Sequence, residues 1–246
     1  MMNRNWAKGI GGAMAMSGAL ALAASGAGAT TTGASGASGA TPNSFTQAQQ
    51  QLEKQLANRS TQLQHLVADV AGAKSLTTAD ANILNARLST EAASITALIA
   101  KVPTDTKRAE LNSDRAAMLK DNRVYAVMTP QVFVTIGADT AGAQAAVLTG
   151  NEPALASEVA SIGVGMPGYR NALDHYNNYV SRLNHITDNM TEVVTKVLAQ
   201  TPQGYPGNTH VFVSANHTVL NANVGIAYAS YDASVIALAS GGYTGS

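Results

Sequence analysis

Apolar residues recur at steps of three and four along most of the chain after Ser44, and this spacing constrains the fold more than any other feature of the sequence. It is typical of α-helices that bury one stripe of side chains against a neighbouring helix. The clearest stripe comprises Leu173, Tyr176, Val180, Leu183, Thr187, Met190, Val194 and Val197. The sequence therefore predicts an all-α fold, an elongated antiparallel bundle of long helices that includes one Pro-kinked helix.

The helices before this stripe can be placed from similar patterns. One stripe runs from Phe45 to Val70 and another from Leu84 to Val102, and short turns at 72–77 and 102–105 separate them from their neighbours. We expect a third helix from about residue 104 to 146 with a kink at Pro130, because an interior proline removes a backbone hydrogen bond. The alternative for 124–136 is a hairpin of two strands that turns at Pro130 and Gln131, since the segment is rich in Val, Tyr, Phe and Ile.

Three further helices are predicted after residue 150. A short one carries Leu155, Val159 and Ile162, a long one spans 170–200, and a proline-rich and glycine-rich turn at 201–208 precedes the last. The last helix places large apolar residues on one side, and Asp232 is its only charged residue. The residues of that side are Val213, Leu220, Val224, Tyr231, Val235 and Leu238. A helix this poor in charge is either central in the bundle or a docking surface.

The N-terminal residues predict export. Arg4 and Lys8 precede an uncharged stretch, 9–29, and Ala27 and Ala29 provide the small residues that a signal peptidase recognises. We expect a signal peptide at 1–29, a flexible linker of Ala, Gly, Ser and Thr at 30–43, a helical bundle domain at 44–240 and a disordered tail at 241–246. An uncleaved membrane anchor is the alternative for the first segment. No stable membrane span is expected after cleavage, so the protein would be secreted or noncovalently associated with the cell wall.

Composition narrows the range of functions. The chain has no cysteine, which excludes disulfides, thiolate metal sites and a cysteine nucleophile. Without Arg4 and Lys8, 13 of the 15 basic residues remain against 15 acidic ones, a net charge of about −2, which argues against nucleic acid as a partner. Only 12% of the residues are charged.

Two motifs resemble those of a known group of proteins. The first is R-V-Y-x(4)-P-x-V-x(5)-A-D, from Arg123 to Asp139, and the second is L-x-x-T-P-x-x-Y-P-x-N, from Leu198 to Asn208. Together they resemble uncharacterised secreted helical-bundle proteins of high-GC Gram-positive bacteria. The resemblance implies that the first motif lies inside a long helix and that the second links two antiparallel helices. It implies no activity, cofactor or catalytic residue.

Candidate sites for catalysis or metal binding are weak. His185, Asp188 and Glu192 share one helical face at i, i+3 and i+7 and could hold a divalent metal, but the face points away from the predicted stripe, and a solvated polar face is the ordinary explanation. His217 falls on the apolar side of the last helix, where a hydrogen-bonded core residue is expected. No catalytic motif is recognised, so we predict no catalytic residue and no cofactor.

The remaining candidates form a possible interaction surface of aromatic and cationic side chains, Tyr169, Tyr179, Arg182, Tyr228 and Tyr231. Three hypotheses follow. The first is a non-enzymatic secreted or cell-envelope-associated helical protein with an interaction or structural role, whose partner is an unknown protein, a cell-wall component or a further copy. The second is a secreted metal-dependent enzyme that uses His175, His185, Asp188 or Glu192. The third is a small-ligand carrier with a site between helices near Pro130.

Overall fold

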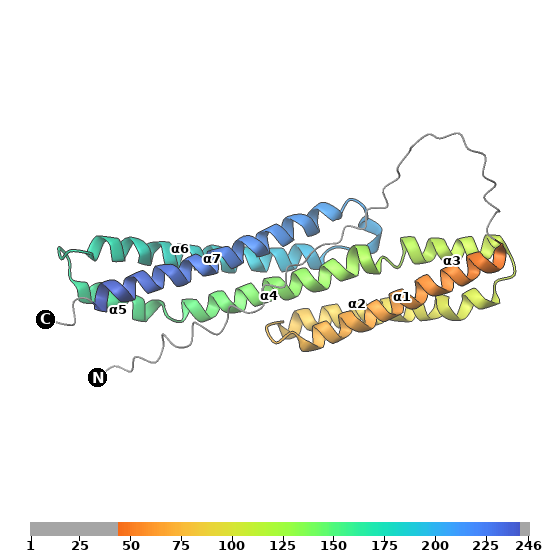
Figure 1. Cartoon of the computed structure of the whole chain (residues 1–246), viewed down its shortest axis with the longest axis horizontal. Helices are drawn as coiled ribbons and strands as arrows, with labels where there is room; N and C mark the ends of the chain where they lie inside the picture. The colour runs from red at the N-terminus through yellow and green to blue at the C-terminus, as the bar shows by residue number, and fades with distance from the viewer. Residues whose placement is uncertain (1–43, 242–246) are drawn as a thin grey trace, which may run out of the picture. The chain divides into compact units, whose positions relative to one another are not determined.

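A computed structural model describes residues 44–241 (Figure 1). The predicted signal peptide, the linker at 30–43 and residues 242–246 of the predicted tail lie outside the described residues. Every regular element within 44–241 is a helix and no strand occurs there, so the predicted all-α class is confirmed.

The first two helices are α1 (Phe45–Gly72) and α2 (Thr78–Lys101), and they pack against each other. Ser44 caps α1 through a reciprocal pair of hydrogen bonds with Gln47, and the Thr77 hydroxyl caps α2 by accepting the backbone N–H of Asp80. Both predicted stripes are buried, as expected from their spacing. The buried residues are Leu52, Leu56, Leu63, Leu66 and Val70 in α1, and Leu84, Leu88, Ile95 and Leu98 in α2.

The prediction of one kinked helix from about 104 to 146 is wrong, because this range is divided into several helical segments. The 3-10 turn η3 (Val102–Thr104) leads to α3 (Arg108–Lys120), a break follows, and the π-helical turn η4 (Val124–Met128) runs directly into α4 (Thr129–Thr149). Pro130 therefore lies in the first turn of α4, where a missing N–H is tolerated. The wider π turn keeps the backbone hydrogen-bonded at this junction, because both the N–H and the hydroxyl of Thr129 donate to the Val124 carbonyl. The hairpin alternative for 124–136 is also wrong, since the segment is helical.

The second half comprises α5 (Glu152–Ile162), α6 (Tyr169–Leu198), the 3-10 turn η5 (Pro202–Gly204) and α7 (Thr209–Gly241). In α5 the three predicted core residues are buried. In α6 the buried stripe is rotated from the predicted one, because Tyr179 is fully buried and Tyr176 only partly so. The buried residues of α6 are Ala172, Tyr179, Leu183, Ile186, Met190, Val193, Val197 and Leu198.

The orientation of α7 is opposite to the one that its large apolar residues suggest. Its buried face is built mainly from alanine, and the larger side chains on the other side are exposed or half-buried. The buried residues are Phe212, Ala215, Val219, Ala222, Ala229, Asp232, Ala233, Ile236 and Ser240. Small residues allow close approach: a Cβ atom added to Gly225 would lie 2.9 Å from Cδ1 of Ile186 in α6. The close contact with α6 therefore turns the large residues outward.

The buried side chains form two clusters. One contains residues of α1, α2, α3, η4 and the start of α4, and the other contains residues of α4, α5, α6 and α7. Helix α4 contributes Val132 to the first cluster and Val134 to the second, and Val194 of α6 packs against both. Helices α4 and α6 thus join the two clusters.

The helical stretch 108–162 includes an 18-residue window long and apolar enough to cross a membrane, and 39% of this window is buried within the protein. The expectation that no stretch beyond the signal reaches this length and composition is therefore wrong. The core helix of a protein with no membrane span passes the same test, and eight residues of α4 are buried against neighbouring helices.

Candidate functional site

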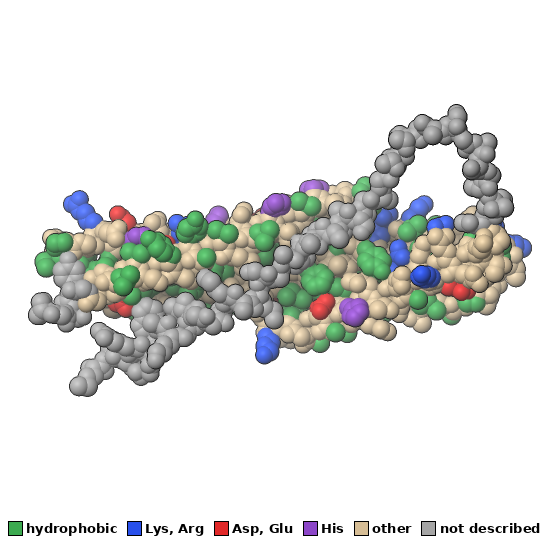
Figure 2. All heavy atoms as spheres, viewed as in Figure 1, with side chains coloured by type: hydrophobic (Ala, Val, Ile, Leu, Met, Phe, Trp, Pro, Cys, Tyr) green, Lys and Arg blue, Asp and Glu red, His purple; other side chains and the backbone are tan. Residues whose placement is uncertain are grey.

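The outward face of α7 carries a continuous row of mostly apolar side chains, which we name the α7 stripe. Its members follow one another at intervals of three or four residues, as in the contact line of a coiled coil. They are Val213, His217, Leu220, Val224, Tyr228, Tyr231, Val235 and Leu238. Tyr231 is 60% exposed and Leu238 78% exposed, and only Val235 is half-buried. Figure 2 shows hydrophobic side chains gathered over the part of the molecule that carries α7.

His217 belongs to this exposed stripe and not to the core, so the expectation of a core histidine is wrong. The side chains beside the stripe are neutral. Ser214, Asn221, Asn223 and Ser234 are all exposed, and α7 contains no Lys, Arg or Glu. The face is therefore apolar along its centre and uncharged along both edges.

The one charged residue of α7, Asp232, is buried against α6. One carboxylate oxygen, Oδ1, lies 2.7 Å from Nδ1 of His175, and Oδ2 lies 3.4 Å from Nε of Arg182. The same two partners contact the tyrosines of the α7 stripe: the Arg182 guanidinium lies 5.1 Å from the centre of the Tyr228 ring, and His175 meets the Tyr231 ring edge-on at 5.9 Å. The buried carboxylate thus positions two cationic or polar groups that in turn hold both exposed rings.

The structure brings together three of the five predicted interaction residues, namely Arg182, Tyr228 and Tyr231. Tyr179 does not belong to an exposed surface, because it is fully buried and its hydroxyl donates to the Leu148 carbonyl. Burial, with a smaller contribution from the Glu152 charge, raises the pKa of Tyr179 to about 12. Tyr169, at the start of α6, is half-buried against the core.

The possible metal ligands lie on the exposed face of α6, as their position relative to the predicted stripe indicated. Glu192 pairs with Lys196 at 2.5 Å, while His185 and Asp188 line an open hollow of about 710 Å³. Among residues 44–241, no group of three or more His, Asp or Glu side chains is placed to hold a metal ion. His175, which the enzyme hypothesis also names, contacts the Asp232 carboxylate through its Nδ1.

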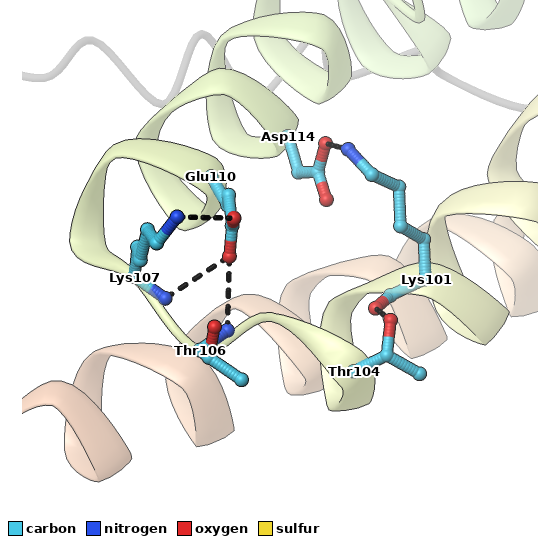
Figure 3. Close-up of polar contacts among 6 residues, drawn as sticks. All are labelled: Lys101, Thr104, Thr106, Lys107, Glu110 and Asp114. Carbon is cyan, nitrogen blue, oxygen red and sulfur yellow. Dashed lines mark hydrogen bonds and ion pairs between the residues drawn. The ribbon is translucent and has the colours of Figure 1, made fainter.

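A second polar cluster joins the end of α2 to the start of α3 (Figure 3). Lys101 forms an ion pair with the buried Asp114. The Glu110 carboxylate accepts the backbone N–H groups of Thr106 and Lys107, both at 3.0 Å, and these hydrogen bonds lower its pKa. The contacts cap α3 and fix the turn before it, which gives the cluster a structural role.

The two sequence motifs also meet in space. Arg123 of the first motif stacks on the ring of Tyr205 in the second, 4.3 Å from its centre, and Asp139 accepts the backbone N–H of Thr77 at 2.8 Å. The motif residues therefore hold helix ends and turns in place.

A smaller hollow of about 340 Å³ lies beside the π turn, between α2, the start of α4 and the turn after α6. It is close to Pro130, the region where sequence analysis placed the site of a possible ligand carrier. Its chemistry is separate from that of the α7 stripe.

Comparison with known proteins gives no match: no protein-family model, no curated protein and no solved structure is similar to the chain. The fold and the surface define it as an all-α protein with an exposed, uncharged helix face.

Proposed function

We propose that this chain is a non-enzymatic, secreted or cell-envelope-associated helical protein that acts through protein–protein contact, and that the α7 stripe binds the α7 stripe of a second copy. The observation that carries the proposal is the exposed, uncharged row of large side chains at coiled-coil spacing.

The chemistry of the stripe favours a second copy as its occupant. Two copies of a charged face would repel each other, whereas this face has no charge at its centre and neutral Asn and Ser at its edges. A partner helix of the same sequence would bring apolar residues at matching intervals. The stripe is therefore complementary to itself.

The available area fits a weak, reversible dimer. Helix α7 has 33 residues and is about 50 Å long. A contact about 10–12 Å wide along that length buries roughly 500–600 Å² on each copy, about 1,000–1,200 Å² in total, which is the size of weak, reversible complexes.

A membrane surface fits the stripe less well. Helices that lie on a membrane usually carry Lys and Arg beside their apolar face, and α7 has neither. The stripe also carries two tyrosines, Tyr228 and Tyr231, and aromatic residues are common at the centres of interfaces. Contacts with Arg182 and His175 hold these two rings in place.

Sedimentation equilibrium of the purified chain tests the proposal. We expect a reversible dimer in the wild type. Leu220→Glu places a charge at the centre of the stripe and should weaken dimerisation by about tenfold or more, because the carboxylate would be desolvated at the contact. Gln64→Glu adds the same charge at an exposed position of α1, outside α7, and should leave dimerisation nearly unchanged.

A monomeric wild type at about 100 μM would overturn the second copy as the occupant. If both substitutions weakened dimerisation equally, the interface would not lie on the stripe. The export part of the proposal is tested separately by the location of the protein in a culture of its source cells, where a purely cytoplasmic signal would contradict it.

A further inference from the structure

The hollow beside the π turn has the features of a ligand site. We propose that it binds a small organic ammonium ion with a short apolar body, and that Glu91 and the side-chain oxygen of Gln131 receive the ammonium group. This site is independent of the α7 stripe.

Gln131 provides the first reason for this assignment. Its side chain is buried, and its Nε2 donates to the carbonyl oxygens of Val197 at 3.0 Å and Gln200 at 2.7 Å. Both N–H bonds of the amide are thus used, and the orientation of the amide is fixed. Its Oε1 is buried and has no hydrogen-bond partner among the described residues, so this acceptor is available to the N–H of a ligand.

Glu91 provides the second acceptor in the same hollow. Its Oε2 is buried and also lacks a hydrogen-bond partner in residues 44–241. Burial, with a smaller contribution from the nearby negative charge of Asp121, raises the pKa of Glu91 to about 7. A cation that enters the hollow beside Glu91 would favour the ionised form of this carboxyl and be attracted by it.

The walls define the rest of the ligand. Ala86, Met128 and Pro202 give an apolar lining, and a volume of about 340 Å³ is at the small end of the range for ligand sites. Arg87 lies in the wall, but its guanidinium is held by the carbonyl oxygens of Leu198 and Gln200 at the end of α6. The N–H bonds that Arg87 retains could bind a carboxylate, so the ammonium could belong to a simple amine or to an amino acid.

A hard metal ion fits the hollow poorly. Calcium needs six to eight oxygen ligands, whereas the buried side-chain oxygens without a partner at this hollow are those of Glu91 and Gln131. An ammonium group needs only a few hydrogen-bond acceptors and tolerates an apolar neighbour. Met128, the last residue of the π turn, lies in the wall, and such turns often accompany functional sites.

Titration of the isotopically labelled full chain by NMR tests the proposal. The probes are n-butylammonium chloride, leucine and, as an uncharged molecule of similar size, 1-pentanol. We expect a charged probe to shift the amide signals of residues 86–91 and 128–131. Glu91→Gln should weaken this binding by about tenfold, the usual effect of losing a charged hydrogen bond. Glu192→Gln removes the same charge from an exposed position and should leave binding unchanged.

Binding of butylammonium at least as tight as that of leucine would assign the site to simple amines, and tighter binding of leucine would assign it to amino acids. The proposal is overturned if neither charged probe binds up to about 10 mM, or if pentanol binds as tightly as both. Retention of full affinity in Glu91→Gln would overturn it too. The shifts in the wild-type chain provide a test that does not depend on the stability of the variant.

Discussion

Asp232 is a single charge in a helix of 33 residues, and its burial explains how α7 is held on α6. Removing a buried carboxylate leaves its partners without compensation, which costs about 3–5 kcal/mol when the partners are buried too. Arg182 and His175 are partly exposed, so water recovers some of this loss. We expect Asp232→Ala to lower the free energy of unfolding by about 2 kcal/mol, measured by urea denaturation.

The matched control is Asp174→Ala, which removes an exposed carboxylate beside His175 and should change stability by less than about 0.5 kcal/mol. Equal effects of the two substitutions would show that the buried ion pair does not hold the helices. Tyr228 and Tyr231 give a second measure, because their fluorescence should become more accessible to quenchers in Asp232→Ala alone.

Glu91 should make stability depend on pH. Its folded-state pKa, about 7, lies above the usual value of 4.5, so the native state favours the protonated form. The stabilisation is complete below about pH 4.5 and is lost as the pH rises through 7. Because the carboxyl is partly exposed, solvent screening reduces the expected change to about 1 kcal/mol.

Urea denaturation at pH 5 and pH 8 measures this change. In Glu91→Gln the difference between the two pH values should shrink by about 1 kcal/mol relative to the wild type, with the gain in stability at pH 8. Glu192→Gln should keep the wild-type difference. A loss of stability at pH 8 in Glu91→Gln would show that the ionised carboxylate is well solvated.

Single residues of the site were predictable only in part. Arg182, Tyr228 and Tyr231 could be proposed from their type, because aromatic and guanidinium groups are common at interfaces. The contact between His175 and Asp232 joins residues 57 positions apart and depends on how two helices are rotated. The signal in the sequence was the isolated charge of α7, which requires a partner if that helix is buried.

The rotation of α7 illustrates the limit of pattern recognition for whole elements. The helix has two rows at steps of three and four, one of large residues and one mainly of alanines, on opposite sides. From the sequence alone, the row of large residues fitted either a central position in the bundle or a docking surface. In the structure the alanines face α6, because small side chains let the two backbones approach.

This packing predicts a large effect of residue size on the inner side of α7. Ala229 is fully buried, so Ala229→Leu must displace the side chains of neighbouring helices, and we expect it to lower the free energy of unfolding by about 1–3 kcal/mol. Ala227→Leu makes the same change at an exposed position of the helix and should be within about 0.5 kcal/mol of the wild type. Thermal denaturation of both variants measures the difference, and a stable Ala229→Leu would contradict the close packing.

Helix boundaries around Pro130 were harder to predict than the helices themselves. Repeated spacing identified α1, α2, α5 and α6 because each has a long, regular stripe. The π turn of 124–128 has no such repeat, and its hydrogen bonds involve the Thr129 hydroxyl as well as the backbone. Proline alone therefore indicated an irregularity but not its type.

At the scale of the whole molecule, the all-α class followed from spacing because the long helices α1, α2, α6 and α7 share the same interval of three and four residues. The division of the core into two clusters did not follow, since it depends on which helices meet. The first cluster centres on α1, α2 and α3, and the second on α5, α6 and α7, with α4 contributing to both. Two clusters joined through shared helices can open separately, as cooperative units of different stability do.

Leu56→Ala tests whether the two clusters open separately. Leu56 is fully buried in the first cluster, and its truncation should cost about 2–5 kcal/mol there. Hydrogen exchange followed by mass spectrometry should then show faster exchange in α1, α2 and α3, with much smaller changes in α5 and α7. Val67→Ala, at an exposed position of the same helix, should leave the pattern unchanged. A uniform increase in the exchange rate across all helices would mean that the clusters unfold as one unit. The shared helices α4 and α6 would then couple the two clusters more strongly than the contacts within each cluster hold it together.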